Sequence, residues 1–253
     1  MPGLKITLLQ QPLIWMDGPA NLRHFDRQLE TVAGRDVIVL PEMFTSGFAM
    51  EAANKSLPQE EVVSWMRSKA QQTNALIAGS AAIQSERGPV NRFLLVEPEG
   101  NVHFYDKRHL FRMADEHQHY QAGDARVIVE WRGWRILPLV CYDLRFPEMY
   151  RQEPIFDVIT MPAAFTYTTG ECHWETLLKA RAIENQSYVI AAAQTGVHPN
   201  GKRTFGHSMI IDPWGKVLAQ QASGNGFALA ELDFDYLATV RSDLPALKNR
   251  VFF

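Results

Sequence analysis

The amino-acid sequence predicts a layered α/β sandwich built on mixed β-sheets. Short apolar and β-branched runs alternate with longer amphipathic segments, which is the pattern of strands interleaved with helices. Glycine-containing turns at residues 98–101 and 131–134 separate neighbouring runs by only a few residues, so those strands are expected to pair as antiparallel hairpins. With 253 residues, of which 46% are hydrophobic and 21% charged, the chain can bury a large core within a single domain, residues 1–253.

The predicted strands are short runs rich in Val, Ile, Leu and aromatic residues, bounded by polar or glycine-containing segments. In chain order they span residues 5–10, 36–40, 75–83, 92–97, 103–106, 126–130, 135–141, 157–161, 188–193, 207–212, 217–221 and 227–233.

The predicted helices are fewer and longer. Residues 20–33 place apolar side chains three or four positions apart, and Gly34 follows, a residue suited to the position just after a helix. Residues 60–72 and 173–185 show a similar apolar stripe. No internal repeat or low-complexity linker divides the chain, so strands and helices are expected to form one body.

Charge and hydropathy exclude several classes of function. The chain has 25 Lys and Arg against 28 Asp and Glu, a formal net charge of −3, and the basic residues are scattered. We therefore expect no nucleic-acid partner. No apolar run is long enough to span a bilayer, so no membrane partner is expected either.

The two cysteines, Cys141 and Cys172, are expected to be reduced thiols. The first residues carry no basic region, long apolar stretch or small-residue cleavage site, which predicts a cytoplasmic protein. The histidines show no metal-ligand spacing, and no glycine-rich phosphate loop follows a strand, so we expect no metal and no cofactor.

Ionisable or nucleophilic residues follow three of the predicted strands. Glu42 ends Leu40-Pro41-Glu42, Lys107 ends Tyr105-Asp106-Lys107, and Cys141 ends an apolar run that starts at residue 136. Taken singly, each has an ordinary structural explanation, because a strand-end cysteine is commonly a small buried apolar residue and a strand-end charge commonly lies on the surface. Taken together, they can meet at one edge of a sheet and line a crevice.

The three segments Leu40-Pro41-Glu42, 105–110 and 141–148 resemble the signature segments of the nitrilase-like carbon–nitrogen hydrolases, in the family's order and at its usual separations. The resemblance covers nearly the whole chain. It continues through residues 161–164, 173–174, 180–185, 206–208 and 212–215.

This resemblance implies a four-layer α-β-β-α sandwich and a role for each matching residue. Cys141 is expected to be the nucleophile, Glu42 the general base and Lys107 the cationic stabiliser. A carboxylate is needed because a thiol is mostly protonated near neutral pH, and a cation favours both the thiolate and the oxyanion that follows. The backbone N–H of Tyr142 is the second expected oxyanion donor.

A second glutamate follows the lysine segment in the family, and Glu116 matches it. It is expected to hold Lys107 and help position the substrate. Asp115 is the adjacent carboxylate that could be confused with it, and the alternative is that residues 114–119 form only a charged surface loop.

Five residues are expected to contact substrate: Phe44, Tyr142, Arg145, Phe165 and His173. Two of these carry open alternatives. Arg145 either binds a distant carboxylate of the substrate or forms a structural ion pair with Asp143. His173 either donates to the substrate or packs near Trp174. Cys172, beside it, is expected to be a non-catalytic thiol.

Two branches of the family compete for the substrate. Residues 10–12, 43–48 and 108–114 resemble ω-amidases, which deamidate 2-oxo-acid ω-amides such as 2-oxoglutaramate. Residues 161–170 through 243–245 resemble deaminated glutathione amidases, and the two resemblances meet near residues 147–156.

The predicted function is cysteine-dependent hydrolysis of a small carboxamide, with such an ω-amide as the expected substrate, through a thioester. The alternatives are a deaminated glutathione amidase, a nitrilase proper and an inactive binding protein of the same fold. The resemblance also implies at least a homodimer.

Overall fold

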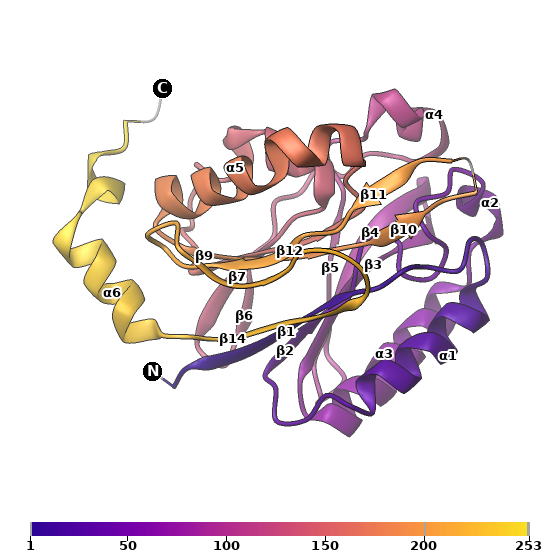
Figure 1. Ribbon diagram of the computed structural model, residues 1–253, viewed down its shortest axis with the longest axis horizontal. Helices are drawn as coiled ribbons and strands as arrows, with labels where there is room; N and C mark the ends of the chain where they lie inside the picture. Colours follow the sequence, from indigo (N-terminus) through magenta and orange to yellow (C-terminus); the bar gives the residue numbers. More distant parts are fainter. Residues whose placement is uncertain (1, 200, 252–253) are drawn as a thin grey trace.

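Two six-stranded β-sheets lie face to face in the computed structural model, which describes residues 2–199 and 201–251. Helices cover the outer faces of the two sheets, so the layers run α-β-β-α (Figure 1). This arrangement confirms the four-layer sandwich with mixed sheets that the sequence predicts.

The first sheet has the strand order β14-β1-β2-β3-β4-β5. The pairs β1–β2 and β2–β3 are parallel, and the other neighbours are antiparallel. Its strands are β1 (Leu4–Gln10), β2 (Val37–Val39), β3 (Leu76–Ser85), β4 (Gly88–Val96), β5 (Val102–Asp106) and β14 (Gly226–Leu232).

The second sheet has the order β13-β12-β9-β8-β7-β6. Here β7–β8 and β8–β9 are the parallel pairs. Its strands are β6 (Val129–Trp131), β7 (Trp134–Pro138), β8 (Val158–Ala163), β9 (Tyr188–Ala193), β12 (Ser208–Ile211) and β13 (Val217–Gln221).

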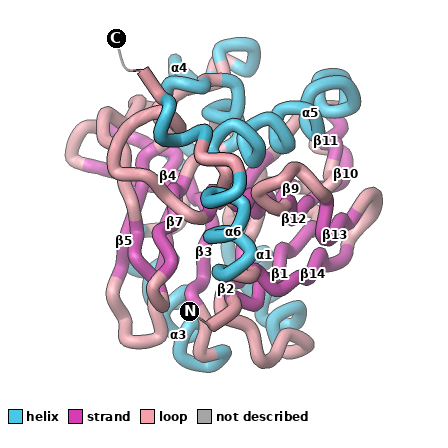
Figure 2. Tube along the Cα trace, turned by 90° about the vertical axis from the view of Figure 1, so that its left-hand side faces the viewer, coloured by secondary structure: helices cyan, strands magenta, loops and turns pink. Residues whose placement is uncertain are grey.

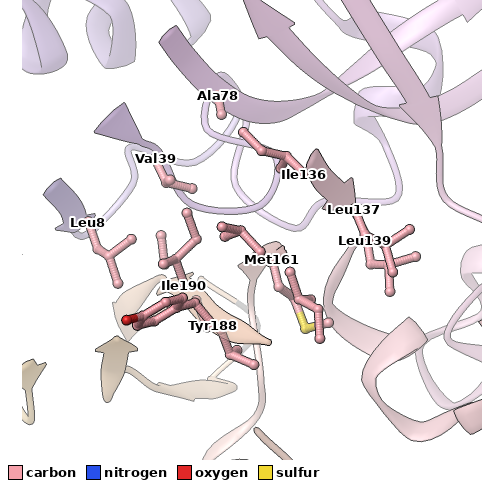
Figure 3. Packing of buried hydrophobic residues seen from close by; sticks show 14 of the residues in the cluster. Leu8, Val39, Ala78, Ile136, Leu137, Leu139, Met161, Tyr188 and Ile190 are labelled. Carbon is pink, nitrogen blue, oxygen red and sulfur yellow. The ribbon is translucent and has the colours of Figure 1, made fainter. Parts of the chain in front are cut away.

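The main hydrophobic core lies between the sheets (Figure 3). Successive side chains of a strand point to opposite faces, and β1 follows this rule: Leu8 points toward the second sheet, and Leu9 points toward the outer helices. From the second sheet, Ile136 and Ile190 close the same core. Both sheets are therefore apolar on the inside, which holds their strand ends in a fixed relation.

Helices α1 (Gly18–Leu29) and α3 (Gln59–Thr73) pack on the outer face of the first sheet. The Asp17 side chain fixes the start of α1 by accepting a hydrogen bond from the Ala20 backbone N–H at 2.9 Å. Helix α5 (Tyr167–Asn185) covers the second sheet. Helix α6 (Phe234–Asp243) lies on the side that faces the viewer in Figure 2. No helix among residues 2–199 and 201–251 is long and apolar enough to cross a membrane.

Several short elements were not predicted from the sequence. The hairpin of β10 (Thr195–Val197) and β11 (Arg203–Phe205) extends beyond the second sheet. The remaining short elements are α2 (Ala52–Lys55), α4 (Glu116–His119) and the 3-10 turns η1 (Arg112–Ala114), η2 (Cys141–Arg145), η3 (Pro147–Met149) and η4 (Ala246–Asn249).

Candidate active site

Glu42, Lys107 and Cys141 converge where strands of both sheets end. Glu42 follows β2, Lys107 directly follows β5, and Cys141 opens the η2 turn after β7. Glu42 and Lys107 are fully buried, and Cys141 is only 8% exposed. Buried charges are costly unless they are paired, so the surroundings of these side chains decide what they can do.

Lys107 lies between two carboxylates. Its Nζ atom donates to Glu42 Oε1 at 2.8 Å and to both oxygens of Glu116, at 3.0 and 2.9 Å. Glu116, the first residue of α4, is itself fully buried and accepts from the Phe111 backbone N–H at 2.6 Å. Glu116 is therefore part of the buried cluster, and the alternative of a charged surface loop is wrong for this residue.

Asn91 belongs to the same cluster, although the sequence did not single it out. It lies in the middle of β4, fully buried, and its Nδ2 atom is 2.9 Å from Glu42 Oε1 and 3.2 Å from Glu116 Oε1. An amide that donates to both carboxylates stabilises their charged forms in a site that excludes water. In the sequence, Asn91 is a single amide just before the predicted strand 92–97, which does not point to a particular partner.

The backbone of Cys141 is held in an unusual conformation. Its φ angle is +46°, in the left-handed region that side-chain-bearing residues rarely adopt. The buried Asp143 carboxylate closes the turn by accepting from the Val140 backbone N–H at 2.9 Å and from the Tyr105 hydroxyl at 2.8 Å. His109 adds its own N–H and its ring Nδ1 to the same carboxylate, at 3.0 and 2.8 Å.

The thiol and Glu42 interact directly. The Cys141 thiol donates a hydrogen bond to the Glu42 carboxylate, and the Ala164 backbone N–H reaches both the thiol and Glu42 Oε2. Burial raises the pKa of the Cys141 thiol well above its usual range; the Glu42 charge adds to this effect, whereas Lys107 opposes it. The resting site therefore holds a neutral thiol, which needs a neighbouring base before it can react.

Glu42 is suited to be that base. Burial raises the pKa of its carboxyl, and the Lys107 charge only partly offsets this rise. Burial alone lowers the pKa of the Lys107 ammonium, but Glu116 and Glu42 outweigh it and leave that pKa raised. The site thus combines a thiol, a carboxylate of increased basicity and a permanent cation, which is what acyl transfer to sulfur requires.

The cavity around the thiol contains three of the expected substrate contacts. Tyr142, Arg145 and Phe165 line a narrow space of about 20 Å³ with Cys141. Arg145 donates to His173 Nδ1 at 3.2 Å and lies over the Phe165 ring. The structural alternative proposed for Arg145, an ion pair with Asp143, is not found, since Asp143 is occupied by other donors.

The structure does not place Phe44 in this cavity. Its side chain is fully buried between the first sheet and the outer helices, with its ring centroid 5.9 Å from Phe25 and 5.7 Å from Trp65. The residue that lines the site is Phe48, four positions later. The chain turns between them, with positive φ at Met43 and Gly47.

A larger cavity of about 400 Å³ adjoins this narrow space. It shares four wall residues with the narrow space: Phe48, Phe111, Ala164 and Thr166. Among the residues that the structure describes, no three His, Cys, Asp or Glu side chains are grouped so that they could hold a metal ion. The site is thus a partly apolar pocket with a buried thiol at its base.

Known proteins are similar to this chain over most of its length. Omega-amidase YafV of Escherichia coli (strain K12) is 63% identical over 250 residues, which is 98% of this chain and 97% of that protein. Deaminated glutathione amidase of Synechocystis sp. is 36% identical over 245 residues, 87% of each chain. The similarity to an omega-amidase therefore extends past residues 147–156, where the sequence predicted that it would stop.

The solved structure of XC1258 from Xanthomonas campestris, a CN-hydrolase superfamily protein with an arsenic adduct in its active site, matches with a TM-score of 0.96 and 37% identity, covering 100% of this chain and 99% of that one. A family model described as carbon-nitrogen hydrolase matches residues 5–242. Fold, buried cluster and sequence thus agree, and this chain belongs to the carbon–nitrogen hydrolase family.

Proposed function

We propose that this enzyme is a cysteine-dependent amidase that hydrolyses the C–N bond of a 2-oxo-acid ω-amide such as 2-oxoglutaramate. One observation carries the proposal: a buried thiol donates a hydrogen bond to Glu42, which in turn is 2.8 Å from the Lys107 ammonium. The similarity to an omega-amidase over 98% of the chain supports the choice of substrate class.

In the first half of the reaction, Glu42 takes the proton of the Cys141 thiol, and the sulfur attacks the carboxamide carbon. Negative charge develops on the carbonyl oxygen, where the Lys107 ammonium and the Tyr142 backbone N–H act as the oxyanion donors. The C–N bond then breaks, Glu42 returns the proton to the leaving nitrogen, and ammonia departs from the thioester.

In the second half, Glu42 takes a proton from water, which attacks the thioester carbon. The same two donors receive the second oxyanion. The C–S bond breaks, the thiol is protonated again by Glu42, and the carboxylic acid leaves. Glu116 and Asn91 do not touch the reacting atoms in this scheme; they hold Lys107 and Glu42 in place.

The alternatives have weaker support. A deaminated glutathione amidase would use the same chemistry on an N-substituted amide, but that relative is 36% identical and the omega-amidase 63%. A nitrilase proper would attack a C≡N bond with the same thiolate. An inactive binding protein is disfavoured because Cys141, Lys107, Glu42 and Glu116 are all present and paired.

Ammonia release is the test of this proposal. We expect purified enzyme to release ammonia from 2-oxoglutaramate with a higher kcat/KM than from deaminated glutathione, glutamine, asparagine or a simple nitrile. Glutamine should be a poor substrate because its ammonium replaces the keto group that a matched site would bind. A preference for glutamine over both keto acids contradicts the substrate class, and a preference for deaminated glutathione contradicts only the choice of branch.

We also propose a cytoplasmic enzyme that is at least a homodimer. Cys172 is a free thiol on the surface, and exposed unpaired cysteines are typical of reducing compartments. The dimer is an implication of family membership. Light scattering coupled to gel filtration measures the oligomeric state, and a monomeric mass at micromolar concentration contradicts it.

A further inference from the structure

The 400 Å³ cavity changes character along its length. Near the thiol its walls are apolar or small, formed by Phe48, Phe111 and Ala164. At the other end it is lined by Lys202 and Arg203 of the β10–β11 hairpin. The volume lies in the range of roughly 300–1,000 Å³ that is typical of small-molecule sites.

Charge at that end favours an anion. Lys202 and Arg203 both carry permanent positive charge at neutral pH, and Glu51 is the one carboxylate among the described residues that line the cavity. His198 also lines it, but burial and the neighbouring Lys202 lower the pKa of its ring, which leaves it neutral. The described side chains that line the cavity thus include two cations and one carboxylate.

The hairpin is tied to the catalytic residues and is not an independent loop. Thr204 forms a β-bridge with Thr166, and the Phe205 backbone N–H donates to the Phe165 carbonyl at 2.8 Å. These partners directly follow Ala164, whose N–H holds Glu42. The base of the hairpin is therefore fixed relative to the thiol.

A second connection involves Gln194 and His198, the residues on either side of β10. His198 Nε2 is 2.9 Å from Gln194 Oε1, and Gln194 donates from Nε2 to the Glu42 backbone carbonyl. The Arg203 guanidinium lies over the Tyr167 ring at 4.5 Å, which limits its orientations. The cationic end of the cavity is thus held at a set position from Cys141.

Arg145 offers less to a substrate carboxylate. The space beside it is about 20 Å³, too small for a carboxylate with its keto group. Its guanidinium already donates to His173 and lies over the Phe165 ring at 5.0 Å and over the Tyr142 ring at 5.9 Å. These contacts give Arg145 a packing role in the wall of the narrow space.

We propose that the β10–β11 hairpin is the element that selects the substrate: Lys202 and Arg203 bind the 2-oxo-carboxylate end of the ω-amide, while its methylene carbons lie against Phe48 and Phe111 and its amide reaches Cys141. This inference rests on the proposed function and adds the residues that recognise the substrate's far end. It assigns to the hairpin the carboxylate-binding role that was one of the two alternatives for Arg145.

The test compares two amides of equal chain length, 2-oxoglutaramate and pentanamide, which lacks the keto and carboxylate groups. We expect the double variant Lys202→Gln/Arg203→Gln to lower the ratio of their kcat/KM values by on the order of tenfold to a hundredfold, mainly through a higher KM for 2-oxoglutaramate. A double variant with the same charge change, Arg151→Gln/Lys216→Gln, should keep the wild-type ratio, because both of its residues lie outside the two cavities described.

Arg145→Gln is measured beside them as the competing site. A hairpin variant with the wild-type ratio overturns the inference, and so does a loss of preference found only in Arg145→Gln. If the wild-type enzyme itself hydrolyses pentanamide as well as 2-oxoglutaramate, the proposed substrate class fails first, and the inference fails with it. The wild-type ratio and the variant ratios thus separate the two failures.

Discussion

Glu42 accepts a hydrogen bond from the backbone N–H of Ala164, 2.9 Å from its Oε2 atom. Glu42 follows β2 of the first sheet and Ala164 follows β8 of the second, so this contact joins the two sheets at the site. The other oxygen, Oε1, is held by Lys107 and Asn91. One oxygen therefore faces the cation, while the other accepts from the Ala164 N–H, which also reaches the Cys141 thiol. The carboxylate is thus held beside the group whose proton it would accept.

Replacing Glu42 by Gln tests this role with little change in shape. A Gln side chain cannot take a proton, so we expect kcat/KM for the ω-amide to fall by about a hundredfold to ten-thousandfold. Ammonia release in the steady state measures the loss, and circular dichroism checks the fold. Turnover close to wild type in Glu42→Gln contradicts the assignment of Glu42 as base.

The acid limb of the pH profile should report the same carboxyl. Burial raises the pKa of Glu42, and its charged form is the one that acts as base in the proposed mechanism. Activity should therefore fall as the pH drops through this raised pKa, so the limb in kcat/KM lies above the ordinary glutamate value of about 4.3. A profile that stays flat down to that value contradicts the raised pKa.

Asn91 gives a sharper version of this experiment. Its Nδ2 hydrogen bonds favour the charged forms of Glu42 and Glu116, so removing them in Asn91→Leu should raise the pKa of Glu42 further. We expect the acid limb to move to higher pH in this variant. Asn101→Leu is the matched control, because Asn101 pairs with Glu97 away from the site. An unshifted limb in an active Asn91→Leu enzyme would show that Asn91 has only a packing role.

The convergence of Glu42, Lys107 and Cys141 could be predicted because each ends an apolar strand, and strand ends of a sandwich meet at one edge. The position of Asn91 could not, since it depends on β4 pairing between β3 and β5, a long-range feature. The prediction that Phe44 contacts the substrate was wrong for a local reason. Positive φ angles at Met43 and Gly47 turn the chain, which buries Phe44 and directs Phe48 to the cavity.

The strands were predicted more accurately than the helices. The predicted strand 188–193 coincides with β9. The helix predicted at 173–185 corresponds to α5, which begins six residues earlier, at Tyr167. Helix α6 was missed because its apolar residues are interrupted, although Asp233 caps it by accepting from the N–H groups of the next turn. The β10–β11 hairpin has strands of three residues, too short for periodicity to detect. That residues 1–253 form a single domain stays a prediction.

Cys141 and Cys172 provide a matched pair of thiols. Cys141→Ala should abolish turnover, whereas Cys172→Ala should keep most of it, because Cys172 is exposed on α5 and lines neither cavity. Rapid acid quenching during turnover, followed by peptide mass spectrometry, should find the acyl group on Cys141. Comparable activity in wild type and Cys141→Ala contradicts the nucleophile assignment, and so does an acyl group found on Cys172.

Lys107→Arg should be poorly tolerated although it keeps the positive charge. The Nζ atom lies between Glu42 and Glu116 at 2.8 to 3.0 Å in a fully buried site, and a planar guanidinium is larger and has a different donor geometry. We expect kcat to fall on the order of a hundredfold to a thousandfold, the usual effect of losing an oxyanion donor. Lys69→Arg, whose ion pair with Asp26 lies on the outer helices, should retain wild-type kcat. Lys107→Arg with near-normal kcat rules out a specific role for the ammonium.

Asp143→Asn should destabilise the turn that presents Cys141 while leaving the reacting groups unchanged. The Asp143 carboxylate accepts from Val140 and Tyr105 on Oδ2 and from His109 on Oδ1, so both oxygens face donors. An Asn amide must turn its NH₂ group toward one of these sets, and a buried donor then lacks an acceptor, at a cost of about 1–3 kcal/mol in the free energy of unfolding. Urea unfolding measures that change, and the exposed Asp124→Asn serves as control.

The same substitution should also affect catalysis. The intact turn holds Cys141 at a φ angle of +46°, and a looser turn would present the thiol less precisely, so kcat should fall more than KM rises. Equal unfolding free energies and equal kcat in Asp143→Asn and wild type would show that the turn holds Cys141 without this carboxylate.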